Sequence, residues 1–131
     1  MKILIAEDDF TSRLLLQELL KHHGSCHVAV NGKEAVEAVR LAFEIGEPYD
    51  LVCLDIMMPE MDGQQALKEI RALEESKGTW ANKKMKIMMT SALADMKNVS
   101  EAHQNLCDAY LLKPIYKSKL LDKLHSLKLI E

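Results

Sequence analysis

Five short apolar runs alternate with amphipathic stretches along the chain, and this pattern constrains the fold more than any other feature. The apolar runs cover residues 2–6, 26–30, 50–54, 85–90 and 109–112. Apolar residues recur at helical spacing in 11–22, in the segments that follow Asn31 and Gly63, in 96–106 and in 117–129. Strands that alternate with helices predict an α/β fold, in which helices cover both faces of a parallel five-stranded sheet.

Two local signals support these assignments. Asn31, followed three residues later by Glu34, has the spacing of a capping box at the start of a helix. The run 50–54 shows no alternation of polar and apolar residues after Asp50, as expected for a strand that is covered on both faces.

The composition is that of one globular domain, which we expect to span residues 1–131. Hydrophobic residues make up 48% and charged residues 28% of the chain. The net charge of −3 argues against binding to nucleic acid. No apolar run approaches the ~18 residues of a membrane span, so no contact with a membrane is expected. Cys26, Cys53 and Cys107 lack the spacing of a metal site, and we expect reduced thiols in a cytoplasmic protein.

Polar side chains stand where the predicted strands end. Right-handed crossovers bring the carboxyl ends of all the strands to one edge of a parallel sheet, where the ligand site of such folds forms. Four of the five runs are followed by residues that carry chemistry: Glu7, Asp8 and Asp9 after the first, Asp55 after the third, Ser91 after the fourth and Lys113 after the fifth. We therefore expect carboxylates, a hydroxyl and an ammonium group to converge at this edge.

Such a cluster suits phosphoryl transfer assisted by a metal. Carboxylates at close range raise one another's pKa unless a cation lies among them, and oxygen ligands favour Mg²⁺. A carboxylate can also attack a phosphoryl donor to form an acyl phosphate, with a lysine and the metal neutralising the charge that develops. Taken singly, these acids could cap helices and Lys113 could be a solvated loop residue, but their joint placement argues against that interpretation.

Four segments carry a resemblance to a known family: ILIAEDD, LVCLDIMMPEMDG, IMMTSA and YLLKP. In this order and spacing, they make the chain resemble the receiver domains of two-component response regulators over essentially its whole length. The resemblance implies a doubly wound, flavodoxin-like sheet with strand order 2-1-3-4-5. It also implies a phosphorylated signalling protein, and not an enzyme beyond slow reactions on itself.

The resemblance assigns roles at the acidic site. Asp55 matches the phosphoacceptor. Asp8 matches a direct ligand of Mg²⁺, for which Mn²⁺ can substitute, and Glu7 matches a carboxylate that reaches the metal through water. Met57 would lend its backbone carbonyl to the metal. Asp9 falls on a variable position of the family and receives no role.

The remaining roles concern the phosphoryl group and the response to it. Lys113 matches the lysine that contacts the phosphate, and its bond to Pro114 is expected to be cis. Ser91, and not the adjacent Thr90, matches the switch hydroxyl. Tyr110 matches the aromatic residue that changes rotamer, so the face formed by 96–106, 109–112 and 117–129 is expected to repack and bind partners.

The resemblance implies partners but does not identify them. We expect a sensor histidine kinase or a phosphotransfer protein as donor, an unknown protein as downstream target, and a monomer when unphosphorylated. Since room for one helix follows Lys113, output is expected through docking on another protein.

The segment 74–86, with Trp80, is longer than the family's pattern. Met57 and Leu93 occupy the positions that control water attack on the acyl phosphate, and their apolar side chains predict slow dephosphorylation.

The sequence argues against three other functions. Phosphatases and phosphotransferases of the haloacid-dehalogenase type place a second aspartate two residues after the nucleophile, where this chain has Met57. A flavodoxin-like redox carrier needs a phosphate-binding loop after the first strand, whereas Glu7, Asp8 and Asp9 would repel the flavin phosphate. A degenerate receiver that acts without phosphorylation is disfavoured because all five expected side chains are present.

Overall fold

The computed structural model describes residues 1–77, 84–92 and 106–131, and these form a parallel five-stranded sheet between helices. The strands are β1 (Lys2–Ala6), β2 (Ser25–Ala29), β3 (Leu51–Asp55), β4 (Lys86–Ser91) and β5 (Ala109–Leu112). The helices of the described part are α1 (Phe10–Leu20), α2 (Gly32–Glu44), α3 (Gly63–Lys77) and α6 (Lys117–Ser126). The strand order β2-β1-β3-β4-β5 confirms the predicted doubly wound fold. The helix expected at 96–106 lies, except for Leu106, outside the described residues, as do Trp80 and Leu93.

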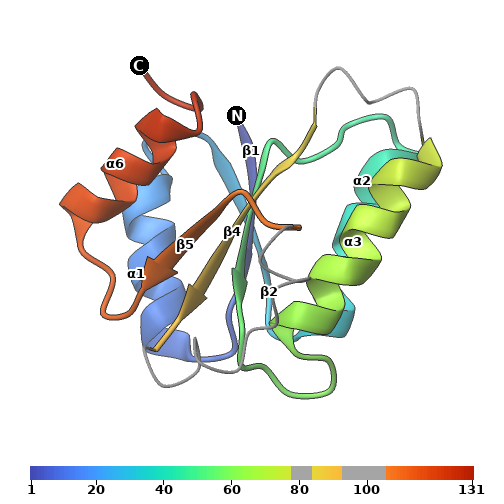
Figure 1. Ribbon diagram of the computed structural model, residues 1–131, viewed down its shortest axis with the longest axis horizontal. Coiled ribbons are helices and arrows are strands. Elements are labelled where there is room, and N and C mark those ends of the chain that lie inside the picture. The colour runs from blue at the N-terminus through green and yellow to red at the C-terminus, as the bar shows by residue number, and fades with distance from the viewer. Residues whose placement is uncertain (78–83, 93–105) are drawn as a thin grey trace.

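The sheet separates two apolar cores, one on each face (Figure 1). Helices α1 and α6 cover the face that receives Ile3, Ile5 and Cys53. Helices α2 and α3 cover the other face, which receives Leu4 and Leu54. Successive strand residues point to opposite faces, so a central strand between two helical layers must be apolar throughout. None of the described helices is long and apolar enough to cross a membrane.

Side-chain caps define where the helices near the sheet edge begin. Asp9 accepts the backbone N–H of Ser12 at 2.9 Å and starts α1. Asn31 accepts the backbone N–H of Glu34 at 2.8 Å, which confirms the predicted start of α2. The returning bond of the Glu34 carboxylate goes to the N–H of Val30, one residue before the expected partner. Each cap satisfies a donor that the first turn leaves unpaired.

A buried arginine joins α3 to the segments that precede β4 and β5. The Arg71 guanidinium donates to the backbone carbonyls of Leu106 at 2.7 Å and Met85 at 2.8 Å, and to the carboxylates of Glu74 at 2.9 Å and Asp108 at 2.7 Å. A side chain that is only 8% exposed can keep its charge because acceptors surround it. Sequence periodicity did not single out this residue, since it treats arginine as a surface side chain.

Candidate functional site

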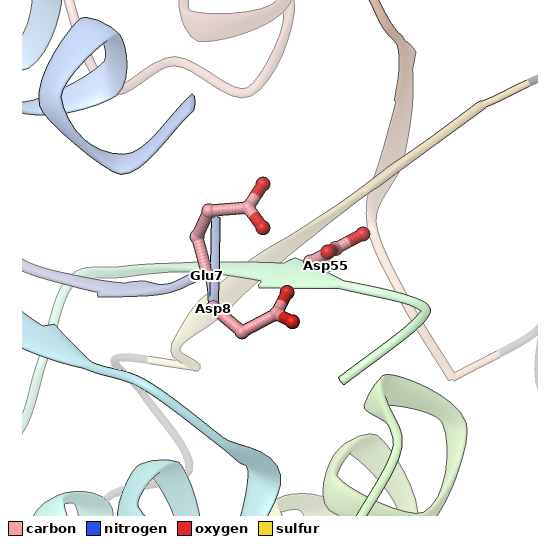
Figure 2. Close-up of side chains that lie close together, drawn as sticks. All are labelled: Glu7, Asp8 and Asp55. Carbon is pink, nitrogen blue, oxygen red and sulfur yellow. The ribbon is translucent and has the colours of Figure 1, made fainter. Parts of the chain in front are cut away.

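Three carboxylates meet at the carboxyl edge of the sheet. Glu7 and Asp8 follow β1 and Asp55 is the last residue of β3 (Figure 2). One oxygen from each of the three lies within 4.8 Å of the others. Glu7 and Asp55 are buried, whereas Asp8 is exposed. The structure brings these three carboxylates together as expected, with Asp55 inside the strand and not directly after it.

Lys113 supplies the positive charge beside these acids. Its Nζ atom lies 2.7 Å from Glu7 Oε1 and 3.3 Å from Asp55 Oδ2. Glu7 is fully buried, so the lysine offsets a charge that burial would otherwise disfavour. The Lys113–Pro114 peptide bond is cis, as expected. The ammonium group therefore bridges Glu7, which follows β1, and Asp55, the last residue of β3.

Burial and neighbouring charge shift the protonation of this cluster. Burial, followed by the hydrogen bond and charge of Glu7, raises the pKa of Asp55 to about 7, and Lys113 only partly offsets this rise. Burial lowers the pKa of Lys113, but the nearby carboxylates of Glu7 and Asp55 outweigh that effect and raise it. Without a further cation, the site therefore disfavours the ionised form of Asp55.

The close approach of α3 shapes the floor of the site. A Cβ atom on Gly63 would lie 2.1 Å from the backbone carbonyl oxygen of Asp55. The Gly63 N–H also donates to the carbonyl of Ile56 at 2.8 Å. Any larger residue would push α3 away from the end of β3, so glycine is required here. The first residue of α3 thus packs directly against the strand that carries Asp55.

The candidate switch residues lie on β4 and β5. Ser91 is the last residue of β4 and, like Thr90, is buried. In the described part of the chain, neither hydroxyl has a hydrogen-bond partner. Tyr110 is half-buried in β5, where burial and its neighbour Cys107 raise its pKa. The Met57 side chain is 58% exposed.

Arg13 is a contact that sequence reasoning missed. Its guanidinium donates to the backbone carbonyl of Glu7 at 3.0 Å and to that of Asp8 at 3.5 Å. The turn that carries both acids is thereby held against the first turn of α1. Periodicity gives no signal for this bond, because Arg13 lies on the flank of the helix and not among its apolar residues.

Comparison with known proteins identifies the family. The family model for the response regulator receiver domain matches residues 3–125. This chain is a member of that family. It is 32% identical to the chemotaxis protein CheY of Bacillus subtilis over 126 residues, which cover 95% of this chain and 94% of that protein. It is 33% identical to the sensory/regulatory protein RpfC of Xanthomonas campestris over 127 residues, 97% of this chain but 16% of RpfC.

Solved structures show the same fold. A CheY-like receiver domain from Methylobacillus flagellatus is 27% identical, with a TM-score of 0.77, and the match covers 97% of this chain and 98% of that one. The complex of CheX, CheY, BeF₃ and Mg²⁺ from Borrelia burgdorferi gives 25% identity and a TM-score of 0.78, covering all of this chain and 90% of that one. Receiver domains are signalling proteins that bind Mg²⁺ at an acidic pocket and interact with histidine kinases or phosphotransfer proteins. This receiver carries such an acidic cluster.

Proposed function

We propose that Asp55 accepts a phosphoryl group from a histidine kinase or a phosphotransfer protein in a reaction that depends on Mg²⁺. Residues 1–131 then act as one receiver domain whose partner binding changes with phosphorylation. The position of Asp55 carries this proposal. Its carboxylate lies at the sheet edge, 3.3 Å from the Lys113 ammonium and within 4.8 Å of the Glu7 and Asp8 carboxylates.

The residues present fit a magnesium ion. Carboxylate oxygens are the ligands that Mg²⁺ takes from proteins, and the ion retains several of its waters. Asp8 is exposed and Asp55 is close to it, so these two can ligate directly. By resemblance to the family, the Met57 carbonyl would be a further ligand. Glu7 is bound to Lys113, which suits an indirect role through water. When bound, Mg²⁺ or Mn²⁺ would neutralise charge on the phosphoryl oxygens.

The side chains themselves account for the transfer. A carboxylate oxygen of Asp55 forms a bond to phosphorus, while the bond between phosphorus and the donor imidazole nitrogen breaks and its electrons stay with the imidazole. Lys113 lies beside the attacking group and can follow the charge onto the phosphoryl oxygens. Ionised Asp55 is the reactive form, so cations at the site favour the reaction by lowering its pKa.

The response to phosphorylation is expected on the side of β5 and α6. Ser91 would bond a phosphoryl oxygen, and Tyr110 would turn into the space that this movement opens. A cavity of about 460 Å³ lies on this face, lined by Tyr110, Leu111, Leu112, Lys119, Asp122, Lys123 and Ser126. We propose this face as the docking surface for a downstream protein, with the unphosphorylated chain a monomer. The net charge of −3 supports a protein target over a nucleic acid.

The test is phosphorylation with acetyl phosphate in the presence of Mg²⁺, followed by mass spectrometry of the intact protein. One phosphoryl group that mild base removes is expected on the wild type and on Asp122→Asn, the matched control on the exposed surface of α6. Asp55→Asn should remain unlabelled, as should the wild type in a chelator. Equal labelling of Asp55→Asn and the wild type would refute the assignment.

A further inference from the structure

Thr90 lies directly beside Asp55 in the sheet. In the pairing of β3 with β4, Asp55 stands opposite Thr90, and β5 places Leu111 on the other side of Thr90. Paired residues of neighbouring strands point to the same face, as Cys53 and Met88 do two residues earlier in this ladder. The side chains of Asp55 and Thr90 therefore both leave the sheet on the face that α1 and α6 cover.

The Thr90 hydroxyl is buried without a partner. The residue is 1% exposed, and its Oγ1 atom makes no hydrogen bond within the described residues. Its backbone carbonyl is already occupied, because it accepts the N–H of Ile56 at 3.0 Å. Burying a hydroxyl without a hydrogen bond is unfavourable, and valine would fill the same volume without that cost. The hydroxyl thus calls for an acceptor that is not in reach in the resting arrangement.

We propose that Thr90 is a positioning residue whose hydroxyl donates a hydrogen bond to the Asp55 carboxyl oxygen that is not bonded to phosphorus once Asp55 is phosphorylated. This inference rests on the proposed function. Forming the acyl phosphate reorients the carboxyl group, and its remaining carbonyl oxygen keeps two lone pairs, so it can serve a metal and a hydroxyl together. Ser91 would hold the phosphoryl group, and Thr90 would hold the side chain that carries it.

The direction of the effect follows from the unpaired state at rest. A bond that exists only after phosphorylation stabilises the phosphorylated form relative to the resting form. Losing one such hydrogen bond should lower the equilibrium constant for forming the modified state by about 3- to 10-fold. Thr90→Val removes the hydroxyl and keeps the shape, so the fold should be preserved. Thr90→Ser keeps the hydroxyl and should retain most of the effect.

The experiment compares wild type, Thr90→Val and Thr90→Ser in their affinity for beryllofluoride with Mg²⁺, measured by calorimetry. Thr90→Val should bind beryllofluoride about 3- to 10-fold more weakly than the wild type, and Thr90→Ser should bind it about as tightly as the wild type. Urea unfolding should show that Thr90→Val is at least as stable as the wild type. In the phosphorylated protein, the infrared carbonyl band of the acyl phosphate should move to higher wavenumber in Thr90→Val, a change that a purely structural role would not cause.

Two outcomes would overturn the idea, and they differ from one another. Equal affinity and an unmoved carbonyl band in Thr90→Val would show that the hydroxyl does not touch Asp55, while the proposed function stands. Failure of the wild type itself to bind beryllofluoride or to take up phosphate would remove the proposed function, and the role of Thr90 with it.

Discussion

Replacing Asp55 with asparagine should stabilise the metal-free protein, and by an amount that depends on pH. Asp55 is buried, and burial together with the neighbouring Glu7 carboxylate raises its pKa from 3.8 to about 7. Asparagine has nearly the same shape and carries no charge at any pH. The substitution therefore removes the cost of ionising a buried carboxyl group while it leaves the packing in place.

The sign and size follow from proton linkage. Below about pH 4 the carboxyl group is protonated in both states and contributes nothing. Between pH 4 and 7 the unfolded chain loses this proton while the folded protein retains it, so wild-type stability falls as the pH rises. Above the folded-state pKa of about 7 the loss is complete. At about 1.4 kcal/mol per pKa unit, the rise from 3.8 to about 7 sets an upper limit of about 4 kcal/mol.

The assay is urea unfolding of wild type and Asp55→Asn at several pH values in the presence of a chelator. The difference in free energy of unfolding should be small near pH 4, increase up to about pH 7 and then level off. Adding Mg²⁺ should narrow the difference by stabilising the wild type. Asp122→Asn, a change of the same kind at an exposed position, should show no such curve. A pH-independent difference, or a less stable Asp55→Asn protein at pH 8, would refute the reasoning.

Three further results are expected. Asp8→Ala should weaken Mg²⁺ binding measured by calorimetry while urea unfolding shows an intact fold, because it removes the exposed carboxylate of the proposed metal site; unchanged affinity would contradict the proposed role of Asp8. Met57→Asn should speed loss of the phosphoryl group by about 10-fold after the donor is removed, because the asparagine amide can orient an attacking water. An unchanged rate of dephosphorylation would show that this position does not control that rate. Arg71→Met should lower the free energy of unfolding by about 3–5 kcal/mol because it leaves buried acceptors unpaired, whereas the surface control Arg40→Met should cost under ~1 kcal/mol; equal losses would contradict this.

Much of the site could be predicted because the alternation of strands with helices and the polar residues at strand ends are both visible in the sequence. The parallel topology then brings Glu7, Asp8, Asp55 and Lys113 to one edge whatever the details of packing. Strand ends were displaced by one residue at Asp55 and Ser91, since a polar side chain that ends a ladder resembles the start of a loop.

Contacts that depend on the depth of a side chain could not be predicted. Among the apolar residues that recur at helical spacing in 11–22, Leu15 is exposed, whereas Leu16 and Leu20 fill the core. Sequence analysis also did not show that Glu7 would be fully buried and Asp8 exposed. The reason is visible in β1: Glu7 continues the face of Ile3 and Ile5 beneath α1, and Lys113 supplies the charge that permits this.

The charges of the site explain why it would respond to both a metal and a phosphoryl group. With all groups ionised, three carboxylates and one ammonium leave two negative charges, which one Mg²⁺ ion balances. Converting the Asp55 carboxylate to an acyl phosphate dianion then adds one negative charge to this cluster. Two buried hydroxyls on β4, those of Ser91 and Thr90, have no hydrogen-bond partner in the described part. In the proposed mechanism, the charge added at Asp55 therefore attracts the hydroxyls of β4. Strand β4 pairs directly with β5, the strand that carries Tyr110.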